Sequence, residues 1–127
     1  MSVRAFYLFA AAGAIACATA GAPSSGPRHD SNVITEQEIA DTHASTAYDV
    51  IKRQRGNYLQ SRGRSSINSS TGEFPSVYLD GQVYGDINSL KNIPAQQIHE
   101  IRYYSAPEAV TKFGMQNSAG VIEVRTK

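Results

Sequence analysis

Five short runs rich in β-branched and aromatic residues predict strands after residue 32 of the chain. Asp80-Gly81 stands between two of these runs, and this dipeptide favours a tight hairpin because both central positions of the turn need a positive φ. The pattern therefore predicts a sheet that contains one hairpin. Its expected strands cover residues 33–35, 76–79, 82–84, 98–104 and 121–125.

Helical spacing and end signals mark three further stretches. Residues 46–55 carry apolar side chains at helical spacing, with Thr46 as the expected N-cap. Residues 86–92 form a short helical turn that Ile93-Pro94 ends, because the residue before a proline avoids the helical region. Residues 105–113 begin as a capping box and end at Phe113-Gly114. The order β-α-β-β-α-β-α-β predicts a small mixed sheet with short helices, in the α+β class.

The first 22 residues have a different pattern, with Arg4 as their only charge and an apolar stretch over residues 5–16. This stretch is shorter than the roughly 20 residues that cross a bilayer as a helix. A basic start, a short apolar stretch and small residues predict a secretory signal peptide. The alternative, a buried N-terminal helix, is disfavoured because the stretch has no polar face.

Two interpretations of the leader's processing remain open. An A-x-A site at residues 18–20 gives a signal peptide of residues 1–20 and a soluble product. Residues 14–17 instead resemble a bacterial lipobox, although Ala14 stands where leucine is usual. This second interpretation predicts a leader of residues 1–16 and lipid attachment at Cys17, which would anchor the protein to a membrane. In both cases the Gly-, Pro- and Ser-rich residues 21–32 are expected to be a flexible linker.

Composition excludes several classes of function. The chain has 127 residues, a net charge of +1 and one cysteine, which argues against a strongly basic nucleic-acid binder and against a disulfide scaffold. Removal of Arg4 with the leader makes the remaining chain neutral. The histidines at 29, 43 and 99 have no ligand spacing for zinc, and no hydrolase or nucleotide-binding motif occurs. We therefore expect no enzymatic activity and no cofactor.

Three surface features leave more than one interpretation. Residues 52–64 carry five basic side chains around Tyr58, which could track a nucleic-acid backbone or face anionic lipid. A solvated helix end followed by a solvated loop fits this segment better. Export of the chain would also separate it from nucleic acid. His99 beside Glu100 could form a pH-sensitive pair, although a simply exposed histidine is favoured. Half of the tyrosines at 78, 84, 103 and 104 are expected in the core.

Four segments in the order 33–39, 77–81, 89–114 and 119–127 together resemble the plug domain of TonB-dependent outer-membrane receptors. That family carries a V-I-T-x-E-E-I strand, an apolar D-G turn, an I-P-x-x-x-I-x-x-I strand, a Y/F-G stop and a G-V-I-x-V-x-T-K strand. The matching residues here are Asp80, Gly81, Ile93, Pro94, Phe113, Gly114 and Gly120. Arg62-Gly63 lies where the family's R-G pair usually lies.

The resemblance implies a plug-like domain over residues 33–127 that binds an outer-membrane barrel or a TonB-system protein, with Arg62, Gly63 and Arg64 in the expected partner-binding loop. The sequence shows no barrel after Lys127 and no TonB-box segment before Val33, so we expect a free-standing, exported, non-enzymatic module. Its expected location is the periplasmic face of the outer membrane or the periplasm. The alternatives are a periplasmic ligand- or peptidoglycan-binding protein and a truncated receptor.

Overall fold

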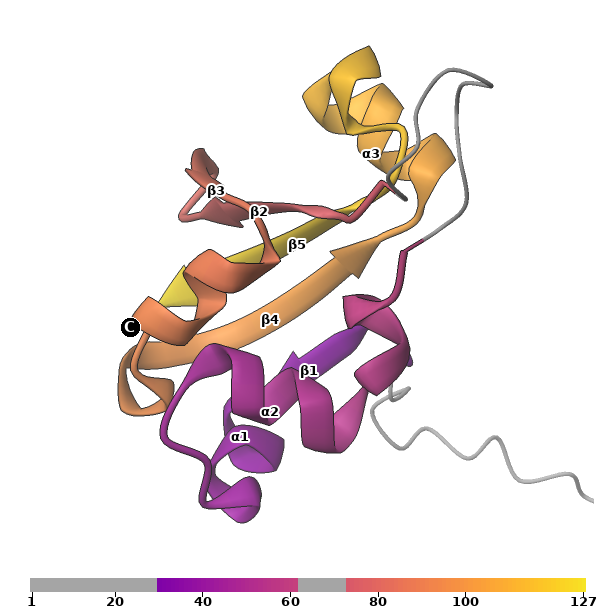
Figure 1. The fold of residues 1–127 in the computed structure, drawn as a ribbon. Coiled ribbons are helices and arrows are strands. Elements are labelled where there is room, and N and C mark those ends of the chain that lie inside the picture. Colours follow the sequence, from indigo (N-terminus) through magenta and orange to yellow (C-terminus); the bar gives the residue numbers. More distant parts are fainter. Residues whose placement is uncertain (1–29, 62–72) are drawn as a thin grey trace, which may run out of the picture.

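A five-stranded mixed sheet organises the part of the chain that the computed structural model describes, residues 30–61 and 73–127 (Figure 1). The sheet order is β1-β4-β5-β2-β3, in which β5 and β2 are parallel and every other neighbouring pair is antiparallel. This result confirms the predicted mixed sheet and α+β class. The strands are β1 (Val33–Thr35), β2 (Ser76–Leu79), β3 (Gln82–Gly85), β4 (Ile98–Tyr104) and β5 (Val121–Thr126).

Most of the helices cover one face of the sheet, and α3 covers one end of the other face (Figure 1). The first face packs against α1 (Glu36–Thr42), α2 (Ala47–Gln54) and the 3-10 helices η1 (Gly56–Leu59), η2 (Ile87–Asn92) and η3 (Ala95–Gln97). The opposite face carries a smaller cluster under α3 (Ala106–Phe113), which the 3-10 helix η4 (Met115–Asn117) follows. The sheet is therefore apolar over one face of β1, β4, β5 and β2, and over only part of the other face.

The sequence did not predict helix α1, and this is the main difference from the expected element order. Thr35 ends β1 and caps α1 at the same time, because its backbone N–H donates to Glu38 Oε2 at 2.8 Å and its hydroxyl accepts from the Glu38 N–H at 3.4 Å. Residues 36–39 are thus helical and do not continue the strand. The predicted helical turn at residues 86–92 is a 3-10 helix.

The ends of α2 and α3 follow the predicted signals. The Thr46 hydroxyl accepts from the Asp49 N–H at 3.3 Å, and Ser105 forms a capping box with Glu108. Gly114, at φ 103°, ends α3. These caps satisfy backbone groups that a short helix otherwise leaves open, so they fix where each helix begins and ends.

The hairpin and the Ile93-Pro94 step hold neighbouring segments together. Asp80 and Gly81 adopt φ 49° and 84°, as a two-residue hairpin turn requires. Ile93 is buried, and its carbonyl accepts from the Ala47 N–H at 2.9 Å. The connection between η2 and η3 is therefore bound to the start of α2.

The four strand tyrosines divide as expected, since Tyr78 and Tyr103 are buried, Tyr104 is half-buried and Tyr84 is exposed. Tyr103 stacks on Tyr58, with 4.4 Å between the ring centroids.

Within residues 30–61 and 73–127, no helix is long and apolar enough to cross a membrane.

The segment before β1 takes part in the folded structure. The Tyr58 hydroxyl donates to the Ser31 carbonyl at 2.5 Å, and Arg55 Nε donates to the same carbonyl at 3.2 Å. The Tyr103 N–H donates to the Asn32 carbonyl at 2.8 Å. Residues 31 and 32, which belong to the predicted linker, therefore satisfy polar groups of the domain.

Candidate functional site

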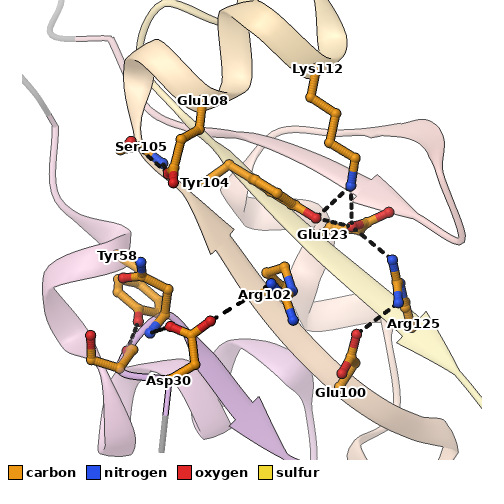
Figure 2. Close-up of polar contacts among 12 residues, drawn as sticks. Asp30, Tyr58, Glu100, Arg102, Tyr104, Ser105, Glu108, Lys112, Glu123 and Arg125 are labelled. Atoms are coloured by element: carbon orange, nitrogen blue, oxygen red, sulfur yellow. Dashed lines mark hydrogen bonds and ion pairs between the residues drawn. The ribbon is translucent and has the colours of Figure 1, made fainter. Parts of the chain in front are cut away.

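The face of the sheet opposite α1 and α2 carries a group of charged side chains, which we call the polar sheet face. Side chains alternate along β4 and β5, so that Ile101 and Val124 face the larger core while their neighbours face the other way. The helix α3 covers this face only near Tyr104 and Val121. The polar sheet face consists of Glu100, Arg102, Glu123 and Arg125, with Lys112 reaching over it from α3 (Figure 2).

Glu123 lies at the centre of this face, with only 5% of its side chain exposed. Its Oε2 accepts from the Tyr104 hydroxyl at 2.9 Å and lies 3.3 Å from Lys112 Nζ (Figure 2). Arg125 Nη2 approaches the same oxygen at 3.7 Å. A covered carboxylate costs several kcal/mol unless charged and hydrogen-bonding groups compensate it. The three partners of Glu123 supply that compensation.

Two further ion pairs extend the network along β4. Arg125 Nη1 lies 3.0 Å from Glu100 Oε1, and Arg102 Nη1 lies 3.7 Å from Asp30 Oδ2 (Figure 2). Arg125 therefore connects the two carboxylates of neighbouring strands. The polar sheet face holds both signs of charge in contact, so it is suited to a hydrated or polar surrounding and not to an apolar one.

Aromatic packing sets the position of Lys112 on α3. The Phe113 ring lies 4.4 Å from the Tyr78 ring and 5.3 Å from the Tyr104 ring, measured between centroids. These contacts place Lys112 Nζ 4.2 Å from the Tyr104 ring centroid. Burial alone would lower the pKa of Lys112, but hydrogen bonds to Tyr104 and Glu123 outweigh burial and raise it. The side chain is therefore a cation at neutral pH.

The hairpin turn is bound to the end of β5. Asp80 Oδ1 accepts from the Thr126 N–H at 2.9 Å, and Oδ2 accepts from the Thr126 hydroxyl at 2.7 Å. The backbone N–H contributes most to lowering the pKa of Asp80, and the hydroxyl adds to it. Asp80 thus serves as a turn residue and as an ionised acceptor.

A separate cleft of about 640 Å³ lies between α1, η3 and the end of β5. Ile39, Ala44, Ala95 and Ile98 supply apolar lining, and polar side chains including His43 and Glu36 lie among them. Its size falls in the range of small-molecule sites, roughly 300–1,000 Å³. The polar groups at this cleft are Glu36, His43, Ser45, Gln96 and Lys127.

Glu36 at this cleft pairs with Lys127 Nζ at 2.7 Å and with His99 Nδ1 at 3.2 Å. The hydrogen bond from Lys127 is the largest cause of the lowered pKa of Glu36. The structure does not support the hypothesis of a pair between His99 and Glu100, because His99 Nδ1 pairs with Glu36 and Glu100 pairs with Arg125. His99 itself is exposed, as favoured from the sequence.

Comparison with known protein families matches residues 28–121 to the TonB-dependent Receptor Plug Domain. The chain belongs to this family. Neither the curated proteins nor the solved structures that were compared with the chain gave a match. Membership associates the plug domain with TonB-dependent receptors, which are transport proteins, and with an outer-membrane or periplasmic context.

The motif residues of the plug domain occupy turn, cap and packing positions. Asp80 and Gly81 form the hairpin turn, and Ile93 and Pro94 join η2 to η3. Phe113 is half-buried and holds α3 on the sheet, Gly114 ends that helix, and Gly120 is a buried residue directly before β5. Cys17 and the loop residues Arg62, Gly63 and Arg64 lie outside the described residues.

Sequence reasoning missed the polar sheet face. The pattern of residues 121–125 has a charge at every second position from Glu123, and the same alternation occurs at Glu100 and Arg102 in β4. This alternation could have indicated one polar face of the sheet. The pairing of Glu123 with Lys112 needed the structure, because α3 has to fold back over β5 to bring them together.

Proposed function

We propose that this plug domain acts without chemistry of its own, through protein contacts at the outer membrane in TonB-dependent uptake. The family match over residues 28–121 is the observation that carries the proposal. The polar sheet face supports it, because ion pairs such as Lys112–Glu123 let the domain lie against a hydrated protein wall without burying unpaired charge. A plug that enters and leaves a barrel needs such a surface.

The proposed partner is an outer-membrane barrel or a protein of the TonB system. Arg62, Gly63 and Arg64 form the proposed contact loop, since residues 60–72 contain two arginines and no acid. Arginine binds carboxylates through two parallel hydrogen bonds, which fixes orientation as well as contact. The partner surface facing this loop is therefore expected to be acidic.

Crosslinking in intact cells tests this proposal. A photoreactive residue at position 61 or 65 should capture an outer-membrane protein, and the double substitution Arg62→Glu with Arg64→Glu should reduce that capture, most visibly at low salt. The control is Lys52→Glu with Lys91→Glu, which changes the net charge equally at exposed positions on α2 and η2. Capture of lipid alone, unchanged by the arginine substitutions, would remove the support for a protein partner.

We further propose export of the protein to the periplasm or to the periplasmic face of the outer membrane. The leader sequence supports this location, and the plug family belongs to the same compartment. If Cys17 is acylated, the protein is anchored by lipid at the N-terminus. Fractionation of cells that express the full chain separates the cytoplasmic, periplasmic and outer-membrane outcomes.

The cleft near Glu36 favours a second candidate function, a periplasmic protein that binds a small ligand or a peptidoglycan fragment. Its volume of about 640 Å³ and its mixed lining suit a compound with both apolar and polar groups. Titration with soluble muropeptides, followed by NMR shifts around Ala44 and Ala95, tests this candidate. Shifts there without outer-membrane capture would favour it over the first proposal.

A further inference from the structure

The two signs of charge on the polar sheet face differ in exposure. The carboxylates of Glu123 and Glu100 expose 5% and 20% of their side chains, whereas Lys112 and Arg125 expose 44% and 48%. The carboxylates therefore lie underneath, and the cationic ends stand outward. Arg102 differs, because its partner Asp30 is itself exposed.

This outward positive charge contrasts with the net charge of the chain around it. Without its predicted leader the chain carries eleven lysines and arginines and eleven aspartates and glutamates, so it is neutral in sum. Long-range attraction to a polyanion such as a nucleic acid or an anionic membrane needs an excess of positive charge. The pair Lys112 and Arg125 is thus suited to local recognition of a few acidic groups.

The geometry lets one incoming carboxylate contact both cations. Lys112 Nζ and Arg125 Nη2 lie 3.3 Å and 3.7 Å from the same Glu123 oxygen, so they are within about 7 Å of each other. A lysine has three donors, of which Tyr104 and Glu123 take two, and an arginine has five. Donors therefore remain on both side chains, and the neighbouring residues hold those side chains in place.

We propose that Lys112 and Arg125 form a docking site for carboxylate side chains of an acidic protein surface. This inference rests on the proposed function and adds a second contact to the one proposed at Arg62 and Arg64. Bidentate and shared contacts to carboxylates favour a protein partner, since they depend on spacing as well as on charge. Glu123 lies beneath both cations, and its negative charge offsets part of theirs.

Substitutions at Glu123 distinguish docking from a merely structural network. Glu123→Gln keeps the size and the hydrogen-bonding groups but removes the covered negative charge, so we expect the acidic partner to bind about threefold tighter. The triple variant combines Glu123→Gln, Lys112→Gln and Arg125→Gln. It removes all three charges, and we expect it to bind the partner about threefold to tenfold more weakly. The control variant, Lys52→Gln with Lys91→Gln, should bind the partner as the original protein does. Melting curves establish that each variant is folded.

Two measurements on the full chain provide the readouts. Carbodiimide treatment of outer membranes that hold the protein should join Lys112 to an Asp or Glu of another protein, identified by mass spectrometry. A hexaglutamate peptide titrated into the purified protein should shift NMR signals of residues 111–113 and 124–126, and inorganic phosphate should compete weakly. Phosphatidylglycerol vesicles test a lipid source of the same charge.

The outcomes separate this inference from the proposed function. A Lys112 crosslink together with opposite effects of the single and triple substitutions supports docking. The docking site is overturned if residue 61 or 65 captures a partner, no Lys112 crosslink forms, and both Glu123 variants bind the partner as the original protein does. The proposed function would then still stand. Absence of capture at either place contradicts both. Binding to vesicles but not to hexaglutamate also overturns the protein-carboxylate assignment.

Discussion

Gly120 combines a positive φ with a close approach to neighbouring residues. Its φ is 100°, and a Cβ atom built on it would lie 2.9 Å from the Tyr104 carbonyl oxygen and 3.0 Å from the Tyr103 hydroxyl. We expect Gly120→Ala to lower the free energy of unfolding by about 2 kcal/mol or more, through strain and clash together. Gly56→Ala is the control, because Gly56 has no positive φ and nothing within 4 Å. Equal denaturation midpoints for the two variants would contradict this account.

Asp80 is one of the carboxylates whose charge contributes to the stability of the domain against acid. Its pKa is lowered by the Thr126 N–H and then by the Thr126 hydroxyl, so the folded state binds its proton less tightly than the unfolded chain. Its stabilising contribution is therefore present at neutral pH and is lost as the pH falls through the folded-state pKa. Asp80→Asn retains a residue that tolerates φ 49° but removes the charge.

Thermal melts of both proteins from neutral pH down to about pH 2 measure this effect. We expect Asp80→Asn to be less stable at neutral pH and to converge with the original protein in acid. Glu36 and Glu108 also have lowered pKa values, so only the difference between the two profiles reports on Asp80. Parallel profiles would show that the contact with Thr126 is insensitive to the charge.

At the scale of elements, α3 depends on Phe113 for its place on the sheet. The ring is half-buried and lies against Tyr78 and Tyr104. We expect Phe113→Ala to cost about 2–4 kcal/mol, since it removes two aromatic contacts and leaves a gap beneath the helix. Denaturant unfolding gives the cost, and a loss below roughly 1 kcal/mol would show that α3 is held mainly by the Lys112–Glu123 contact.

The elements differ in how far the sequence could predict them. The five strands and α2 and α3 follow from local patterns, because β-branched runs, helical spacing and caps all agree there. Helix α1 escaped because it buries only Ile39, which leaves no helical periodicity, and its cap Thr35 is also the last residue of a strand. The polar sheet face escaped because charges in a strand resemble ordinary solvent-exposed positions until α3 is placed over them.

At the scale of the whole molecule, the plug domain includes the segment that precedes β1. Tyr58 and Arg55 both donate to the Ser31 carbonyl, and Tyr103 donates to that of Asn32. A fragment of residues 33–127 should still unfold cooperatively, but it loses these acceptors and leaves the buried Tyr58 hydroxyl without its bond. We therefore expect the free energy of unfolding of a fragment of residues 30–127 to exceed that of the 33–127 fragment by about 1–3 kcal/mol. Equal melting temperatures would show that water replaces the lost acceptors.

We propose that the first 20 residues are an export leader, whose processing would set whether the domain is soluble or lipid-anchored. Residues 14–17 favour lipid attachment at Cys17, whereas residues 18–20 favour cleavage that removes this cysteine. Under the lipoprotein hypothesis, cells that express the protein incorporate labelled fatty acid into it. Cys17→Ala should then abolish the label and release the protein from the outer membrane, because stable anchoring needs the acyl chains. Cys17→Ala leaves the A-x-A site intact, so loss of the label cannot be ascribed to removal of that site. An intact mass that begins at an unmodified Gly21 would contradict lipidation, and the domain would then reach its partner from the periplasm.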